Sequence, residues 1–150
     1  MTRAAALLLC LAAAGCSGGA GSPLAVEPGT PCSQCRMTVL EPKLASQLLA
    51  PGEEPRFFDD LGCLAAYLSA HPAEAGATKY VADHATGQWI EASRAVYGRH
   101  EALATPMNSH LFAHATAAAR AADAGVKGAR ALTFAEVFGV TAPVEAHRDR

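Results

Sequence analysis

Short apolar runs, separated by Pro, Gly and charged residues, follow one another along most of the chain after residue 36. Runs of this length, rich in branched and aromatic residues and bounded by turn residues, are typical of strands. They predict strands over residues 37–40, 45–49, 56–58, 79–83, 89–90, 95–97 and 109–114. The Pro- and Gly-containing segment 51–55 predicts a hairpin loop.

Helical spacing of apolar residues replaces this pattern at three places. One apolar stripe predicts a helix over Leu61 to Ala70, which Asp59 or Asp60 can cap. The Ala-rich stretch 115–124 predicts a second helix, which a glycine closes. A Thr and Glu capping box predicts a short third helix within residues 133–138.

The order of these elements repeats itself. A strand pair, a helix and a further strand occur over residues 37–90 and again over residues 95–138. The sequence therefore predicts an α+β fold of two small strand-strand-helix-strand units in pseudo-repeat, with antiparallel sheets and packed helices.

The N-terminus has the features of an export signal. A basic residue at Arg3 precedes an apolar run that is too short to span a bilayer, and small residues lead into Cys16. We expect cleavage before Cys16, lipid attachment to its thiol and a periplasmic location, with ordinary secretion as the alternative. The predicted layout is a signal peptide (residues 1–15), a lipidated flexible tether (16–31), one domain (32–140) and a disordered tail (141–150).

Composition and charge limit the kinds of partner that the protein can bind. The 150 residues carry 12 Lys and Arg against 14 Asp and Glu, a net charge of −2, and no basic run is interleaved with aromatic residues. This pattern excludes a nucleic-acid-binding surface of the usual kind. After the signal no apolar run is long enough to span a bilayer, so we expect contact with the membrane through the lipid anchor.

Soft sulfur donors are the most specific chemistry in the chain. Cys32-Ser33-Gln34-Cys35-Arg36-Met37 is accompanied by a third thiol, Cys63, and by the thioether of Met107. Thiolate and thioether ligands favour Cu(I). In a strand, Cys35 and Met37 would share one face and could bind the same ion. The alternative, that both methionines fill gaps in a core, stays open.

The thiols and histidines allow other interpretations. A structural disulfide between Cys32 and Cys35 is plausible in an oxidising compartment. Cys63 lies in the first turn of a predicted helix, where a thiol pKa is lowered, although the interpretation that we favour is a small buried residue. His110 lies near Met107 and is the best imidazole candidate. Asp83 and His84 could form a metal pair, but beside a tight turn they more often cap it.

Three function classes follow from these residues. The first is a metal carrier that uses Cys35, Met37 and Met107, with His110, Cys63 and Cys32 in support. The second is a thiol-dependent enzyme, a lyase or a thiol-exchange catalyst, in which Cys35 or Cys63 is the nucleophile. The third is a lipoprotein scaffold that binds no metal.

Four blocks together resemble the NosL-type copper chaperones that accompany assembly of nitrous oxide reductase. The blocks are residues 32–37, residues 57–63, residues 80–83 with 86–92, and Thr105-Pro106-Met107. The resemblance implies a periplasmic, lipid-anchored protein that is not an enzyme. It implies that Cu(I) is bound through Cys35 and Met37 with Met107 and delivered to the copper–sulfide centre of the reductase.

Two departures from the family pattern bear on that expectation. Arg36 stands where members commonly have Gly between the second Cys and the Met, and Asn108-Ser109-His110 follows Met107 where a Gly commonly comes soon after. A cationic side chain beside the site favours a thiolate but opposes a bound cation. The resemblance therefore leaves copper affinity and the recipient protein open.

Overall fold

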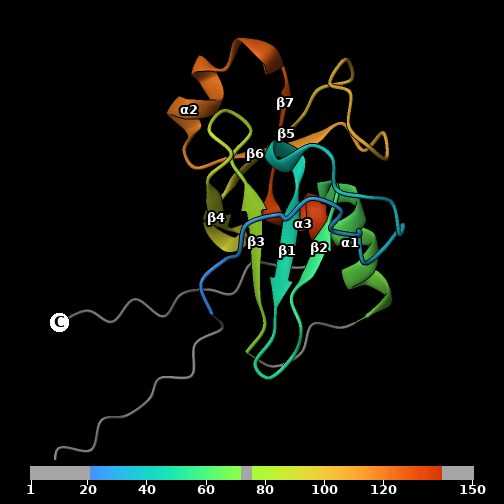
Figure 1. The fold of residues 1–150 in the computed structure, drawn as a ribbon. Helices are drawn as coiled ribbons and strands as arrows, with labels where there is room; N and C mark the ends of the chain where they lie inside the picture. The colour runs from blue at the N-terminus through green and yellow to red at the C-terminus, as the bar shows by residue number, and fades with distance from the viewer. Residues whose placement is uncertain (1–20, 72–75, 140–150) are drawn as a thin grey trace, which may run out of the picture.

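The first predicted unit folds as an antiparallel four-stranded sheet with one helix beside it. In a computed structural model that describes residues 21–71 and 76–139, the strands pair in the order β2-β1-β3-β4. Figure 1 shows α1 next to β2 at one edge of this sheet. The elements are η1 (Pro42–Leu44), β1 (Ser46–Leu49), β2 (Arg56–Phe58), α1 (Leu61–Ala70), β3 (Thr78–Ala82) and β4 (Trp89–Glu91).

The second unit is a three-stranded antiparallel sheet with the order β6-β5-β7. It lies toward the top of Figure 1, with α2 at the upper left and α3 in the middle of the molecule. Its elements are η2 (Ala92–Arg94), β5 (Val96–Arg99), β6 (Leu111–His114), α2 (Ala117–Ala122), η3 (Ala124–Val126), β7 (Arg130–Leu132) and α3 (Phe134–Phe138).

The predicted pseudo-repeat is confirmed, because the two units share topology and connections. In each, the first strand lies between the second and the third, and a 3₁₀ turn precedes it. In each, the helix is capped by the residue before its first turn: Asp60 accepts a hydrogen bond from the backbone N–H of Cys63, and Thr116 from that of Ala119. The fold is the predicted α+β mixture.

A matching loop also occurs in both units. The N–H of Cys32 donates to the carbonyl of Met37 over 2.7 Å, and the N–H of Asp83 donates to the carbonyl of Gln88 over 2.8 Å. Loop 32–37 then pairs in parallel with β2, as loop 83–88 does with β6. The predicted strand over residues 37–40 is therefore wrong. Only Thr38 makes a bridge, because residues 32–37 curl into a turn instead of extending.

The units share one hydrophobic core. Phe58 and Leu64 of the first unit pack in the same cluster as Tyr97 of β5 and Phe138 of α3. The bridge between Asp83 and Ala113 joins the end of β3 to β6. The two sheets therefore form a single packed body.

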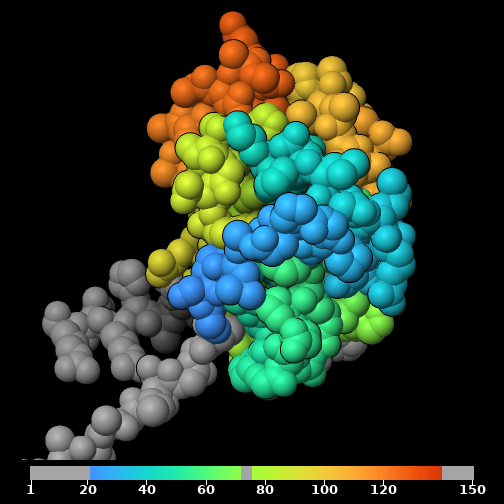
Figure 2. All heavy atoms as spheres, viewed as in Figure 1, coloured from blue at the N-terminus to red at the C-terminus, as the bar shows by residue number. Residues whose placement is uncertain are grey.

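The N-terminal segment of the described chain lies across the first unit. Both the backbone N–H and the carbonyl of Leu24 bond to the buried side chain of Gln47, each over 3.0 Å. Figure 2 shows this segment, in blue, resting on the surface of the first unit. The segment that enters the domain therefore lies over β1, one of the two inner strands of the sheet.

Further predictions concern the ends of helices and strands and the two ends of the chain. The capping box of Thr133 and Glu136 is confirmed at the start of α3. The prediction that His110 belongs to the strand over residues 109–114 is wrong. Its φ of 59° turns the chain just before β6 begins. The predicted signal peptide, residues 16–20 of the tether with Cys16, and the tail from residue 141 lie outside the described residues. Across the described ranges, no helix is long and apolar enough to cross a membrane.

Gly98 of β5 provides a test of the core. A Cβ at this position would lie 2.4 Å from Cζ of Phe112, its buried cross-strand partner. We expect Gly98→Ala to lower the free energy of unfolding by about 1–3 kcal/mol, because the enclosed ring has no room to move. Urea denaturation measures this. Gly21→Ala, whose Cβ meets nothing within 4 Å, is the control, and equal stability of both variants would contradict the packing described here.

Candidate metal centre

Three thiols and one carboxyl group converge where loop 32–37 meets the start of α1. One ligand atom from each of Cys32, Cys35, Asp59 and Cys63 lies within 4.8 Å of the others. The Sγ of Cys35 donates to Oδ2 of Asp59 over 3.2 Å. Cys32, Cys63 and Asp59 are buried, and Cys35 is partly exposed. This is a donor set that a metal ion can occupy.

Each residue reaches the site through a local feature of the sequence. Cys32 is held against β2 by its bridge to Phe57, and the turn that follows places Cys35 beside it. Asp59 comes directly after β2, and Cys63 lies in the first turn of α1. All three cysteines are free thiols, so the structure does not contain the disulfide considered between Cys32 and Cys35.

Asp60 connects this cluster to Met107. One carboxylate oxygen accepts from the N–H of Cys63 over 2.9 Å, and the other accepts from the N–H of Met107 over 3.1 Å. Asp60 is completely buried. The residue that caps α1 therefore also fixes the loop that carries the second thioether.

A cavity of about 290 Å³ opens between these two segments, lined by Gln34, Cys35, Gly62, Cys63, Ala66, Met107 and Ser109. Gly62 allows the close approach of the walls, because a Cβ there would lie 2.7 Å from Cβ of Ser109. The structure thus brings Cys35, Cys63 and Met107 to one cavity, with Cys32 behind Cys35.

Two of the predicted ligands lie elsewhere. Met37 is 54% exposed and does not line the cavity, and it shares no strand face with Cys35 because the chain turns at Arg36, whose φ is 68°. The ring Nδ1 of His110 lies 2.8 Å from the carbonyl of Leu103, outside the thiol cluster. Its proximity to Met107 in sequence does not bring its ring into the cluster.

Comparison with protein-family models gives one match, to NosL, over residues 23–139. This match spans both units and the candidate metal centre. The chain belongs to the NosL family. No curated protein matches the sequence. Family membership gives the protein a copper-related accessory role, and the thiol cluster is where this NosL family member could bind a metal.

The environment of Cys35 and Cys63 favours the protonated thiol. Burial raises the pKa of Cys35 to about 11, with Asp59 and Cys32 adding to the effect and a backbone hydrogen bond from Met37 opposing it. Burial, again followed by Asp59, raises the pKa of Cys63. The lowering expected at a helix N-terminus is outweighed there, because desolvation disfavours the charged thiolate.

Only part of this site could be predicted from the sequence. The strand-to-helix step at residues 59–60 indicated a cap, but it did not reveal that Asp60 caps α1 while Asp59 points toward the thiols. Oδ1 of Asp59 is buried and has no hydrogen-bond partner within the described part of the chain. A buried carboxylate oxygen that lacks a partner is unfavourable, which makes Asp59 a group whose environment a bound cation would improve.

The thiol of Cys35 gives a pH prediction for the metal-free, reduced protein. At neutral pH its pKa of about 11 leaves very little thiolate, so alkylation of Cys35 should be slow and should accelerate as the pH rises toward 11. Asp59→Asn should shift this profile to lower pH, because the substitution replaces a charged acceptor of the S–H by a neutral amide. Mass-resolved rates of iodoacetamide labelling measure both profiles. Identical profiles for the two proteins would contradict the contact between Asp59 and Cys35.

Proposed function

We propose that this protein is a Cu(I) metallochaperone on the periplasmic side of a membrane, and that it delivers copper to the copper–sulfide centre of nitrous oxide reductase. The observation that carries the proposal is the meeting of Cys35 and Met107 in one open cavity. A thiol and a thioether that face the same space form a soft donor pair, which suits Cu(I) better than zinc, calcium or magnesium. Membership of the NosL family supports the same metal.

We assign the primary donors to Cys35 and Met107, with the thioether of Met37 as the third. Charge favours a second thioether over a second thiolate. Cu(I) with one thiolate is neutral, whereas ionising Cys63 would add negative charge close to Asp59, and both burial and Asp59 already raise the pKa of Cys63. Met37 is two residues from Cys35 at the exposed edge of the loop, and its unbranched side chain is flexible enough to turn inward.

Copper binding requires that Cys35 lose its proton, and the cavity that Cys35 lines lets this proton leave to solvent. The S–H of Cys35 donates to Asp59 over 3.2 Å. A thiol is a metal ligand only as the thiolate, so binding is coupled to proton release. The charge of the metal then takes the place of the proton beside Asp59. Copper loading is therefore coupled to the release of one proton.

The exposure of the thioethers suits transfer of the ion to another protein. Met37 is 54% exposed and Met107 is 45% exposed. A partner's thiolates or imidazoles can approach the ion from this side and replace weak thioether ligands one at a time. The buried thiols behind Cys35 remain out of reach of such a partner.

The thiol environment disfavours the enzyme hypothesis. A nucleophilic cysteine requires a lowered pKa or an adjacent base. Burial raises the pKa of both Cys35 and Cys63, and the cluster of described residues around them holds no histidine. The arrangement therefore favours thiols that ionise when a metal arrives.

Removing ligands one at a time tests the copper site. Cys35→Ala should abolish stoichiometric Cu(I) binding, since it removes the anionic donor. Met37→Leu and Met107→Leu should each weaken binding about tenfold or more, on the order of 1.4 kcal/mol, with little loss of packing volume. Anaerobic competition against a Cu(I) chelator measures affinity, and X-ray absorption should show the loss of one sulfur in each of the two Met variants.

Cys63→Ala serves as the comparison in the same assay, and it should bind Cu(I) as the unmodified protein does. A strong loss of affinity in Cys63→Ala with none in Met37→Leu would contradict the assignment of Met37 as the third ligand. Unchanged Cu(I) binding by Cys35→Ala would overturn the site itself.

We also propose that lipid on Cys16 holds the protein at the membrane, on the basis of the small residues that precede this cysteine. Stable attachment requires more than one acyl chain, as lipoprotein processing supplies. Cys16→Ser should release the protein into the soluble periplasmic fraction, which cell fractionation and immunoblotting can follow. Persistence of the Ser variant in washed membranes would show that another feature anchors it.

A further inference from the structure

A second cluster of metal-binding side chains lies in the second unit. Nδ1 of His84 lies 2.7 Å from Oδ2 of Asp123, and Nε2 of His114 lies 3.0 Å from the same oxygen. The three donor atoms all fall within 4.8 Å of one another. These residues are far apart in sequence and come from loop 83–88, the end of β6 and the start of η3.

The cluster lies on the same kind of backbone frame that carries the thiols, at neighbouring positions of it. The backbone N–H of His84 donates to the carbonyl of Ala113 in β6 over 2.9 Å, as the N–H of Ser33 donates to Phe57 in β2 over 2.7 Å. His84 is therefore the counterpart of Ser33, one residue after Cys32, and His114, the last residue of β6, is the counterpart of Phe58, one residue before Asp59. The two clusters therefore use different positions of the pseudo-repeat.

The donor set of the second corner suits a borderline divalent ion. Two imidazoles and one carboxylate are common ligands of Zn²⁺, whereas they offer none of the sulfur that favours Cu(I). Zinc bonds of about 2.0–2.2 Å in tetrahedral geometry place ligand atoms roughly 3.4 Å apart. The contacts of 2.7 Å and 3.0 Å to Asp123 would need to open by roughly 0.7 Å and 0.4 Å to reach this separation.

Asp123 is already oriented and ionised. Its Oδ1 accepts the N–H of Gly125 over 2.8 Å, which leaves Oδ2 for the two imidazoles. The hydrogen bond from His84 lowers the pKa of Asp123 to about 2, so the carboxylate is charged at any physiological pH. His114 is completely buried, and its Nδ1 has no hydrogen-bond partner within the described residues. Asp123 is thus the polar group that holds the buried ring.

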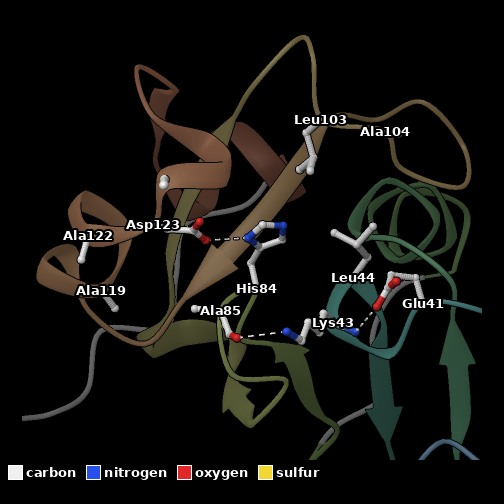
Figure 3. Close-up of a pocket in the computed structure, with 11 residues that line it drawn as sticks. Glu41, Lys43, Leu44, His84, Ala85, Leu103, Ala104, Ala119, Ala122 and Asp123 are labelled. Carbon is white, nitrogen blue, oxygen red and sulfur yellow. Dashed lines mark hydrogen bonds and ion pairs between the residues drawn. The ribbon is translucent and has the colours of Figure 1, made fainter.

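A cavity gives access to this cluster. His84 and Asp123 line a hollow of about 670 Å³, whose other walls include Glu41, Leu44 and Leu103. Figure 3 shows His84 pointing into this space, with Asp123 on one side and Leu44 and Glu41 across from it. An ion held here by three protein ligands would have a fourth position open toward the hollow, as in zinc sites that bind an exchangeable ligand.

We propose that His84, His114 and Asp123 bind one Zn²⁺-like divalent ion, separately from the sulfur site. Each imidazole binds through the nitrogen that now contacts Asp123, so the proton there moves to the other ring nitrogen or to solvent. The chain would then carry two sites with opposite preferences, sulfur for Cu(I) in the first unit and nitrogen and oxygen for a divalent ion in the second.

The test uses the mature chain with Cys35→Ala, so that thiols do not dominate zinc binding and the result does not depend on the copper proposal. Zn²⁺ is titrated against a chromophoric chelator in this protein, in Cys35→Ala/His84→Ala and in Cys35→Ala/His71→Ala. His71 is an exposed histidine outside the cluster. We expect one bound Zn²⁺ in the first and third proteins and at least tenfold weaker binding in the second. Thermal unfolding should show a zinc-dependent rise in Tm in the same two proteins.

X-ray absorption at the zinc edge supplies the second measurement. Nitrogen and oxygen scattering with an imidazole pattern supports the site, whereas sulfur scattering would place the ion at the remaining thiols and overturn it. Equal zinc affinity in all three proteins, or no stoichiometric binding in any of them, would also overturn it. In that case the Asp123 carboxylate serves only to tie the two histidines together.

Discussion

The sulfur site depends on the two hydrogen bonds that the carboxylate of Asp60 accepts. One buried carboxylate begins α1, by capping the N–H of Cys63, and fixes the distant Met107 loop by accepting its N–H. Because the bond to Cys63 is buried and the bond to Met107 is partly buried, losing either would leave a poorly solvated donor as well as a looser loop. Gly62 completes the arrangement, since its missing Cβ lets Ser109 approach the helix. The soft donors are therefore held together by a carboxylate that does not itself belong to the thiol cluster.

The pseudo-repeat gives the two donor clusters a similar backbone frame. Each unit places a tight loop in parallel against its second strand. The first unit carries thiols and Asp59 at this junction, whereas the second carries imidazoles and Asp123 at neighbouring positions that are not equivalent to them. The side chains of the two clusters therefore differ in softness although the backbone around them is alike.

Periodicity and capping predicted the units well, because those signals are local. The helix over Leu61 to Ala70 and the capping box at Thr133 were predicted as they occur. The predicted strand over residues 37–40 was wrong, since an apolar run does not reveal that the preceding residues turn at a positive φ. The convergence of Asp59 with Cys35, and of Asp123 with His84, depends on tertiary pairing of the loops with β2 and β6. No spacing in the sequence carries that information.

The turn at Arg36 is the strained point of the loop that carries Cys32 and Cys35. Arg36 has a φ of 68° and Gly87, at the equivalent point of the second loop, has a φ of 76°. Glycine adopts this conformation freely, whereas another residue is destabilised by roughly 1–2 kcal/mol, so the first loop is strained at a turn that the second loop makes freely. The Arg36 guanidinium lines a hollow of about 440 Å³ with Arg56 and His71, which differs from the cavity that Cys63 and Met107 line. Its charge is therefore not directed into the cavity of the soft donors, and burial, Asp59 and Cys32 raise the pKa of Cys35 there.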